Sequence, residues 1–290
     1  MADQERLPAL LIIGAMKSGT TSLYMDLADH LGIYLAENKE PHHLCDDHVL
    51  SPAGRAAYAD LYAKAQPHET LCDASTGYTK IPEHTGVVER ATAVLPAGFK
   101  AIYVVRNPIE RALSHYRHDH VAGTVGDDID AELRRHPRYV DFGRYAMQLG
   151  PWLDALGSER VLVVSFERYV ADRAKVLAGI ADFLGLAPRI EDREPAKAYN
   201  QSKQKPRRNR AWDLVYESWL YRRVLRPLVP LKLRLRLFKL LLPKSDPTGL
   251  HASDETLAWL RAELAPDAAE LAAVVGEPFW PELTGPAAPA

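Results

Sequence analysis

Residues 6–27 read RLPALLIIGAMKSGTTSLYMDL, and this stretch decides the fold. An apolar run ends at Gly14, and a helical pattern resumes after Gly19. A strand, a glycine-containing loop and a helix start, in that order, aim backbone N–H groups and a helix dipole at a phosphate. A Walker A loop carries its lysine directly after the second glycine. Here Thr20 stands at that position and the lysine, Lys17, lies inside the loop.

Residues 99–118 read FKAIYVVRNPIERALSHYRH and contain a second strand-to-helix transition. The apolar, β-branched part ends at Arg106. Asn107-Pro108 then breaks the strand, and Pro108 suits the first position of a helix. Ser114 follows Arg106 by about two helical turns. A guanidinium fork and a hydroxyl can both donate hydrogen bonds to phosphate oxygens.

These two segments resemble the sulfotransferases that use 3′-phosphoadenosine 5′-phosphosulfate (PAPS). The pattern G-x-x-K-x-G-T-T from Gly14 is similar to their phosphosulfate-binding loop, and a strand-end arginine with a serine holds the 3′-phosphate in that family. The resemblance implies PAPS as co-substrate, with no metal required. The cofactor-binding residues that it implies in these two segments are Lys17, Ser18, Gly19, Thr20, Thr21, Arg106 and Ser114.

Residues 38–43, NKEPHH, resemble the K-E-x-H segment of the heparan-sulfate-type sulfotransferases. The general base of that branch is the glutamate, which implies Glu40 here. His42 is the alternative, because other sulfotransferases use a histidine. Lys39 is a candidate to hold the sulfonate, and Lys17 is the candidate that stabilises the leaving phosphate. A carboxylate that works near neutral pH is expected to have its pKa raised by partial burial.

Two further segments match the same family by position. Residues 73–78, DASTGY, resemble an acidic-x-S-P-x-Y segment in which Thr76 replaces the proline, and this makes Ser75 and Tyr78 candidate substrate contacts. Residues 199–210 fall where the family closes a loop on the 3′-phosphate and adenine. The candidate cofactor contacts in this loop are Lys203, Lys205, Arg207 and Arg208; a solvated basic loop is the alternative.

The order of apolar and helical segments predicts an α/β fold with a P-loop-like, mainly parallel sheet flanked by helices and a helical C-terminal portion. Residues 253–275 are expected to form two short helices split by Pro266. The expected strands lie near 10–14, 70–74, 101–105 and 161–166, and the expected helices at 20–31, 82–94, 108–121, 143–156 and 173–184. Ligands of parallel sheets bind beyond the carboxyl ends of the strands, so the candidate residues are expected on one rim.

The chain is expected to form one domain over 1–290, with a basic helical lid at 203–250 and a flexible tail at 284–290. The net charge is −2, yet residues 203–244 contain 13 Lys or Arg against two acids. Such asymmetry indicates an anionic partner. With the two nucleotide motifs, a lid over a bisphosphorylated nucleotide explains it better than nucleic acid does. The leucine-rich part, 232–243, leaves peripheral membrane contact open beside the simpler interpretation of a surface helix.

The two cysteines provide neither a disulfide framework nor a metal-ligand spacing. A reducing, cytoplasmic location is therefore expected. The sequence contains no apolar run long enough to span a membrane and no metal-ligand cluster.

The resemblance implies transfer of a sulfuryl group from PAPS to a hydroxyl, or less readily an amine, of a small-molecule, lipid or glycan acceptor. Two alternatives belong to other classes. A P-loop small-molecule kinase would need a lysine after the second glycine and an acidic magnesium ligand, for which Asp73 is the candidate. A non-catalytic nucleotide- or polyanion-binding protein would use the basic segment. Acceptor pockets of the family are built from variable loops, so the acceptor stays open.

Overall fold

The computed structural model of the chain describes residues 6–36, 39–186 and 250–284. Its centre is a five-stranded sheet in the order β2-β3-β1-β4-β5, in which every neighbouring pair is parallel. The strands are β1 (Leu10–Gly14), β2 (Ile33–Leu35), β3 (Thr70–Ala74), β4 (Lys100–Val105) and β5 (Val161–Ser165). The expected α/β fold with a parallel sheet is confirmed.

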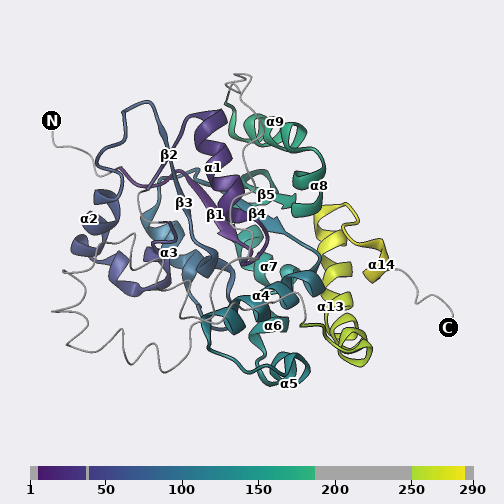
Figure 1. Cartoon of the computed structure of the whole chain (residues 1–290). Coiled ribbons are helices and arrows are strands. Elements are labelled where there is room, and N and C mark those ends of the chain that lie inside the picture. Colours follow the sequence, from purple (N-terminus) through teal and green to yellow (C-terminus); the bar gives the residue numbers. More distant parts are fainter. Residues whose placement is uncertain (1–5, 37–38, 187–249, 285–290) are drawn as a thin grey trace, which may run out of the picture.

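Helices connect and flank these strands (Figure 1). The helices before β4 are α1 (Thr20–Leu31), α2 (Pro52–Asp60) and α3 (Val87–Val94). Between β4 and β5 lie α4 (Pro108–Ala122), α5 (Ile129–Arg135), α6 (Arg138–Asp141) and α7 (Tyr145–Leu156). After β5 come α8 (Phe166–Ala171), α9 (Arg173–Leu184), α13 (Asp254–Val275) and α14 (Pro281–Thr284).

The central strand β1 is buried along its whole length. Leu11 and Ile13 face a core formed with α3, α7 and α13, whereas Leu10 and Ile12 face a core formed with α1 and α9. A strand covered on both faces needs apolar residues at successive positions rather than at alternate ones. The continuous apolar run before Gly14 therefore specifies a central strand of a layered sheet.

The helix starts follow from local capping. Asn107 accepts hydrogen bonds from the backbone N–H groups of Ile109 and Glu110 through Oδ1, at 3.1 and 3.2 Å, and α4 begins at Pro108 as expected. Ser253 caps α13 in the same way, through its Oγ and the N–H of Thr256 at 3.2 Å. Side-chain acceptors at these positions satisfy N–H groups that the helix leaves unpaired.

The C-terminal segment differs from the expectation. Residues 254–275 form one continuous helix, α13, with Pro266 inside it, and the prediction of two short helices is wrong. Leu260, Leu264 and Leu271 on α13 are buried on both sides of the proline. The burial of these three leucines outweighs the free-energy cost of a proline within a helix.

Other differences concern short elements. The helix expected from 82 begins at Val87, after Gly86 in a left-handed conformation. The edge strand β2 and five short helices were not predicted; these helices are α2, α5, α6, α8 and α14. Ser51-Pro52 is nevertheless a typical helix start, and Ser51 does cap α2. Within the described ranges, no helix has both the length and the apolar composition needed to cross a membrane.

Candidate active site

The loop between β1 and α1 lies at the carboxyl end of the central strand. Lys17 has φ of 71° and Gly19 has φ of 83°, and α1 begins directly after Gly19 with no side-chain cap. The first N–H groups of an uncapped helix are donors for an anion, and the helix dipole adds to the attraction. Thr20 and Thr21 form the first turn, while Ser18 is fully buried beside the Tyr145 hydroxyl.

Arg106 brings the second segment to this loop. It follows the last residue of β4, and its Nη1 donates to the carbonyl of Lys17 at 3.3 Å. Its Nη2 lies 3.5 Å from the Glu110 carboxylate. Ser114 lies on α4 and is partly buried. The two candidate anion-binding segments, residues 14–21 and 106–114, are about ninety residues apart in sequence and are in direct contact through Arg106 and Lys17.

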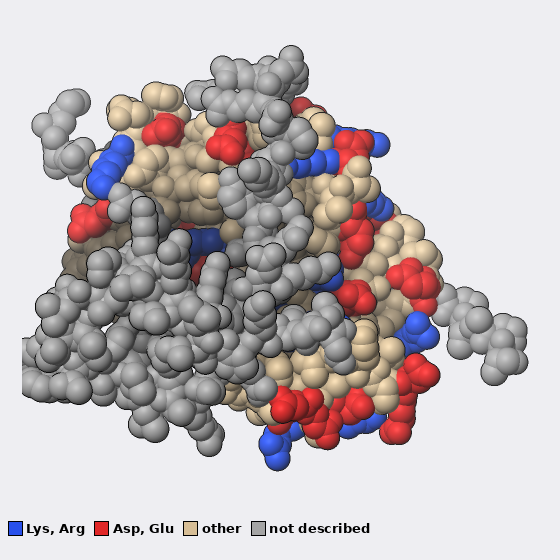
Figure 2. All heavy atoms as spheres, in the orientation of Figure 1, with Lys and Arg blue, Asp and Glu red and all other residues tan. Residues whose placement is uncertain are grey.

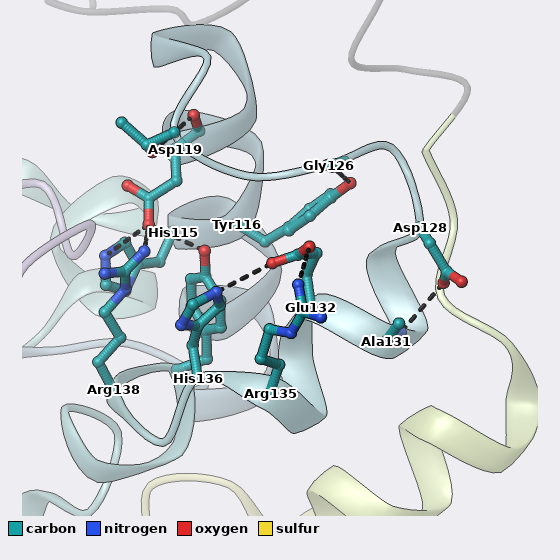
Figure 3. A network of polar contacts seen from close by, with 12 residues as sticks. His115, Tyr116, Asp119, Gly126, Asp128, Ala131, Glu132, Arg135, His136 and Arg138 are labelled. Atoms are coloured by element: carbon teal, nitrogen blue, oxygen red, sulfur yellow. Dashed lines mark hydrogen bonds and ion pairs between the residues drawn. The ribbon is translucent and has the colours of Figure 1, made fainter.

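A network of polar contacts anchors α4, the helix that carries Ser114 (Figure 3). The Asp119 carboxylate accepts hydrogen bonds from Arg138 at 2.8 Å and from the Tyr139 hydroxyl at 2.9 Å. His115 Nε2 lies 3.5 Å from the same carboxylate, and burial lowers the pKa of His115. These contacts fix α4 to α6. Figure 3 also shows the neighbouring pair of Glu132 and His136, in which His136 Nε2 lies 3.0 Å from Glu132 Oε2.

Glu40 lies between three polar side chains. Lys39 Nζ is 2.7 Å from its Oε1, the Thr76 hydroxyl donates to its Oε2 at 3.1 Å, and His42 Nε2 is 3.6 Å from Oε2. Burial alone would raise the pKa of Glu40, but the contacts from His42, Lys39 and Thr76 outweigh it and lower the pKa to about 2. The pKa of Glu40 is thus shifted in the direction opposite to the one that partial burial would give, because these three partners stabilise the ionised carboxylate.

Three non-glycine residues in the described part of the chain have a positive φ: Lys17 at 71°, Glu40 at 61° and His42 at 57°. Side chains with a Cβ rarely adopt this conformation, and such strain is concentrated at functional sites. The same three residues are the catalytic candidates expected from the sequence. Their unusual backbone is independent of the family resemblance.

The segment after β3 fixes the backbone of His42. The Ser75 hydroxyl accepts a hydrogen bond from the His42 N–H at 3.1 Å and donates to Asp73 Oδ1 at 2.7 Å. A Cβ on Gly77 would lie 2.6 Å from His42 Nδ1, so glycine permits the close approach of the ring. Ser75 therefore joins His42 to a carboxylate in the core.

That carboxylate, Asp73, is the centre of a buried network that sequence reasoning missed. The hydroxyls of Tyr58 and Tyr78 both donate a hydrogen bond to Asp73 Oδ2, each at 2.6 Å. Burial raises the pKa of Asp73, against the opposing effect of the three hydroxyl donors. The hydroxyls of the substrate candidates Ser75 and Tyr78 thus bind Asp73. Tyr58 lies on the unpredicted helix α2, and so no sequence signal linked it to the site.

Figure 2 shows basic and acidic atoms next to one another deep in the molecular face, left of its centre and below a rim of uncharged residues. The remaining cofactor candidates, Lys203, Lys205, Arg207 and Arg208, lie outside the described residues, as does the basic segment 203–244 as a whole. Among the residues that are described, no group of three or more His, Cys, Asp or Glu could hold a metal ion.

Comparisons with known proteins identify the family and the fold. A family model described as a sulfotransferase domain matches residues 7–213. Heparan sulfate glucosamine 3-O-sulfotransferase 3B1 of Mus musculus is 28% identical over 225 residues, which are 71% of this chain and 52% of that protein. Heparan sulfate glucosamine 3-O-sulfotransferase 6 of Homo sapiens is 30% identical over 199 residues, which are 66% of this chain and 56% of that protein. The chain spans about half the length of these curated relatives.

Among solved structures, a sulfotransferase from Alicyclobacillus acidocaldarius is 22% identical and superposes with a TM-score of 0.63. The match covers 94% of this chain and 97% of that one, so the two proteins share a fold. The family model covers well over half of the chain, and its range includes both anion-binding segments and Glu40. The chain belongs to the sulfotransferase family.

Proposed function

We propose that this protein transfers the sulfuryl group of PAPS to an acceptor hydroxyl. The observation that carries the proposal is the strained backbone shared by Lys17, Glu40 and His42. Strain of about 1–3 kcal/mol at each such residue persists only where the surrounding structure enforces it. Its location at the three catalytic candidates supports an active site rather than a simple binding surface.

The reaction makes two demands that these residues can meet. As the bond from the acceptor oxygen to sulfur forms and the bond from sulfur to the bridging oxygen breaks, negative charge develops on the leaving phosphate. Lys17 and the uncapped N-terminus of α1 are suited to stabilise that charge. The acceptor proton passes to Glu40, which is ionised at neutral pH and which His42 and Thr76 hold in place.

Lys39 has two roles in this proposal. It forms an ion pair with Glu40 at 2.7 Å, and its ammonium group is a candidate to contact the sulfonate of the donor. Arg106 and Ser114 are proposed to hold the 3′-phosphate. Ser75 and Tyr78 are proposed to shape the substrate site indirectly. Both bind the Asp73 carboxylate, and Ser75 also holds the backbone of His42.

The kinase alternative gains no support from the geometry. Thr20 stands where a kinase has its P-loop lysine. Asp73, the candidate magnesium ligand, is 1% exposed and accepts hydrogen bonds from three hydroxyls. A magnesium ligand needs oxygens that are accessible to the metal and its water shell.

The acceptor class is a proposal that rests on relatives. The curated matches act, by name, on heparan sulfate glucosamine, so a glycan is the first acceptor to test, with lipid and small-molecule hydroxyls as the other arms. We also propose a cytoplasmic location, which Cys45 and Cys72, both free thiols, support.

The test is donor-dependent turnover. Purified protein is incubated with PAPS and each acceptor class in the presence of EDTA, and formation of adenosine 3′,5′-bisphosphate is measured together with the sulfated product. We expect turnover that survives EDTA and falls by about 10²–10⁴-fold in Glu40→Gln, which keeps the size of the side chain but cannot accept the proton. Turnover that needs magnesium and ATP would contradict the proposal.

A further inference from the structure

The segment Ser165-Phe166-Glu167 lies at the junction of β5 and α8 and contacts both candidate anion-binding segments, at Gly19 and at Arg106-Asn107. We propose that Phe166 and Glu167 are positioning residues for Arg106 that set the preference for a 3′-phosphorylated nucleotide. The inference rests on the proposed function, because it assumes that Arg106 binds the 3′-phosphate.

Arg106 is held on three sides before any ligand binds. The guanidinium of Arg106 lies over the ring of Phe166, with 5.2 Å between Arg106 Cζ and the ring centroid. One edge of the guanidinium donates to the Lys17 carbonyl at 3.3 Å, and another lies 3.5 Å from the Glu110 carboxylate. A cation stacked on an aromatic face with donors engaged at its edge has few alternative rotamers.

Phe166 also contacts the phosphosulfate loop. Gly19 has φ of 83°, and a Cβ placed on it would lie 2.6 Å from the Phe166 ring. Glycine at this position therefore leaves room for the ring as well as permitting the turn. Phe166 touches both the loop and Arg106, and so it sets the spacing between the two anion-binding segments.

Glu167 fixes the backbone next to Arg106. Its Oε1 accepts a hydrogen bond from the N–H of Asn107 at 2.7 Å, and its Oε2 accepts one from the Ser165 hydroxyl at 2.9 Å. Asn107 directly follows Arg106 and caps α4. The carboxylate therefore orients the turn from which Arg106 projects and the start of the helix that carries Ser114.

A guanidinium held in place before binding loses less conformational freedom when a phosphate arrives. If Phe166 and Glu167 act through Arg106, their removal weakens the binding of nucleotides that carry the 3′-phosphate more than the binding of nucleotides that lack it. If they only support the protein core, their removal affects all nucleotides equally or lowers stability alone.

The experiment is calorimetric titration of the full chain with adenosine 3′,5′-bisphosphate and with adenosine 5′-monophosphate, which lacks the 3′-phosphate. The measured quantity is the ratio of the two affinities. In Phe166→Leu we expect this ratio to fall about three- to tenfold, because binding of the bisphosphate weakens more than binding of the monophosphate. In Glu167→Ala we expect a fall of about two- to fivefold, and Glu167→Gln, which keeps an acceptor for the Asn107 N–H, should restore most of the ratio.

Phe183→Leu is the matched control. Phe183 is also a partly buried phenylalanine with a cation over its ring, Lys100 Nζ at 4.8 Å, and it packs against the same core as Phe166. Lys100 begins β4, whereas Arg106 follows its end, so this ring is remote from the site. We expect the affinity ratio of Phe183→Leu to equal that of the wild type. If Phe166→Leu does not fold, the Glu167→Ala and Glu167→Gln pair decides the question by the same ratio.

The outcomes distinguish a failure of the inference on Phe166 and Glu167 from a failure of the proposed function. An unchanged ratio in Phe166→Leu and Glu167→Ala, or an equal loss of affinity for both nucleotides, would overturn the inference and leave the proposed function intact. A wild-type protein with no preference for the 3′-phosphate would overturn the proposed function itself.

Discussion

At the scale of single residues, the site depends on backbone conformations that the side chains alone would not choose. Lys17 and His42 have a positive φ, as does Glu40 between Lys39 and Pro41. The surrounding contacts enforce them: the Lys17 carbonyl binds Arg106, and the His42 N–H binds Ser75. Such fixed geometry places charged groups before the reaction begins, which is the main source of electrostatic catalysis.

Replacement of Lys17 tests whether a charge positioned in advance stabilises the leaving phosphate. Lys17→Ala should lower kcat by about 10²–10³-fold, because a charge directed at the developing phosphate is lost. The control is Lys175→Ala, which removes an exposed lysine in the first turn of α9. Single-turnover rates with PAPS measure the effect; a Lys17→Ala rate close to that of the control would remove Lys17 from the mechanism.

The ionisation of Glu40 predicts a pH-dependent stability. Its pKa falls on folding from 4.5 to about 2, so the folded state binds fewer protons than the unfolded state between these values. The stabilisation is therefore present above about pH 4.5 and is lost as the pH falls through the folded pKa. Urea unfolding of the wild type and Glu40→Gln should show a difference at pH 6 that shrinks towards pH 3. A difference that is independent of pH would contradict the ion pair with Lys39.

At the scale of helices and strands, tertiary contacts decide where local propensity does not. The helix α13 continues through Pro266, and the next residue, Asp267, accepts hydrogen bonds from the N–H groups of Ala146 and Met147, both at 3.0 Å. Asp267 thereby satisfies the first turn of α7, which has no cap of its own. Helix α13 is thus joined to α7, which packs against β4 in the core.

Asp267→Ala should destabilise the protein by about 1–2 kcal/mol, because two N–H groups of α7 lose their acceptor. Glu270→Ala, an exposed position one turn further along α13, is the control and should change stability by less than about 0.5 kcal/mol. Urea denaturation of both variants at neutral pH measures this. Equal stability of the two variants would show that Asp267 does not act as the cap of α7.

The difference between local sequence signals and tertiary contacts explains which parts of the fold the sequence could predict. The four longer strands, the helices α1, α4 and α9 and the start of α13 were predicted, because continuous apolar runs, Asn107-Pro108 and Ser253 are local signals. The three-residue strand β2 lacks such a signal. The network around Asp73 joins α2 to the end of β3, and the low pKa of Glu40 depends on Thr76, distant in sequence. Contacts of this kind exist only in the folded chain.

At the scale of the whole molecule, the sheet assembles the site from separate parts of the chain. The order β3-β1-β4 places the segment after Ala74, the loop after Gly14 and Arg106 at the carboxyl ends of three adjacent strands. The predicted rim of the parallel sheet is confirmed for these three segments. One ligand can therefore bridge two of them, and binding should stabilise the fold as a unit.

Adenosine 3′,5′-bisphosphate at about 100 times its Kd should raise the free energy of unfolding by about 2.7 kcal/mol. Arg106→Ala should remove most of this increment at the same ligand concentration, because the charge-assisted bonds to the 3′-phosphate are lost. Thermal unfolding with and without the nucleotide measures it, with Arg55→Ala, an exposed arginine on α2, as the control. Equal ligand stabilisation of both variants would refute the role of Arg106.

Calorimetric titration of the wild-type chain with adenosine 3′,5′-bisphosphate, ADP and ATP, each with and without magnesium, tests the central claim most directly. We expect binding that requires the 3′-phosphate and does not require magnesium, because Lys17, Arg106 and the N-terminus of α1 supply the positive charge. Preferential binding of ATP in the presence of magnesium would contradict it and would support a kinase.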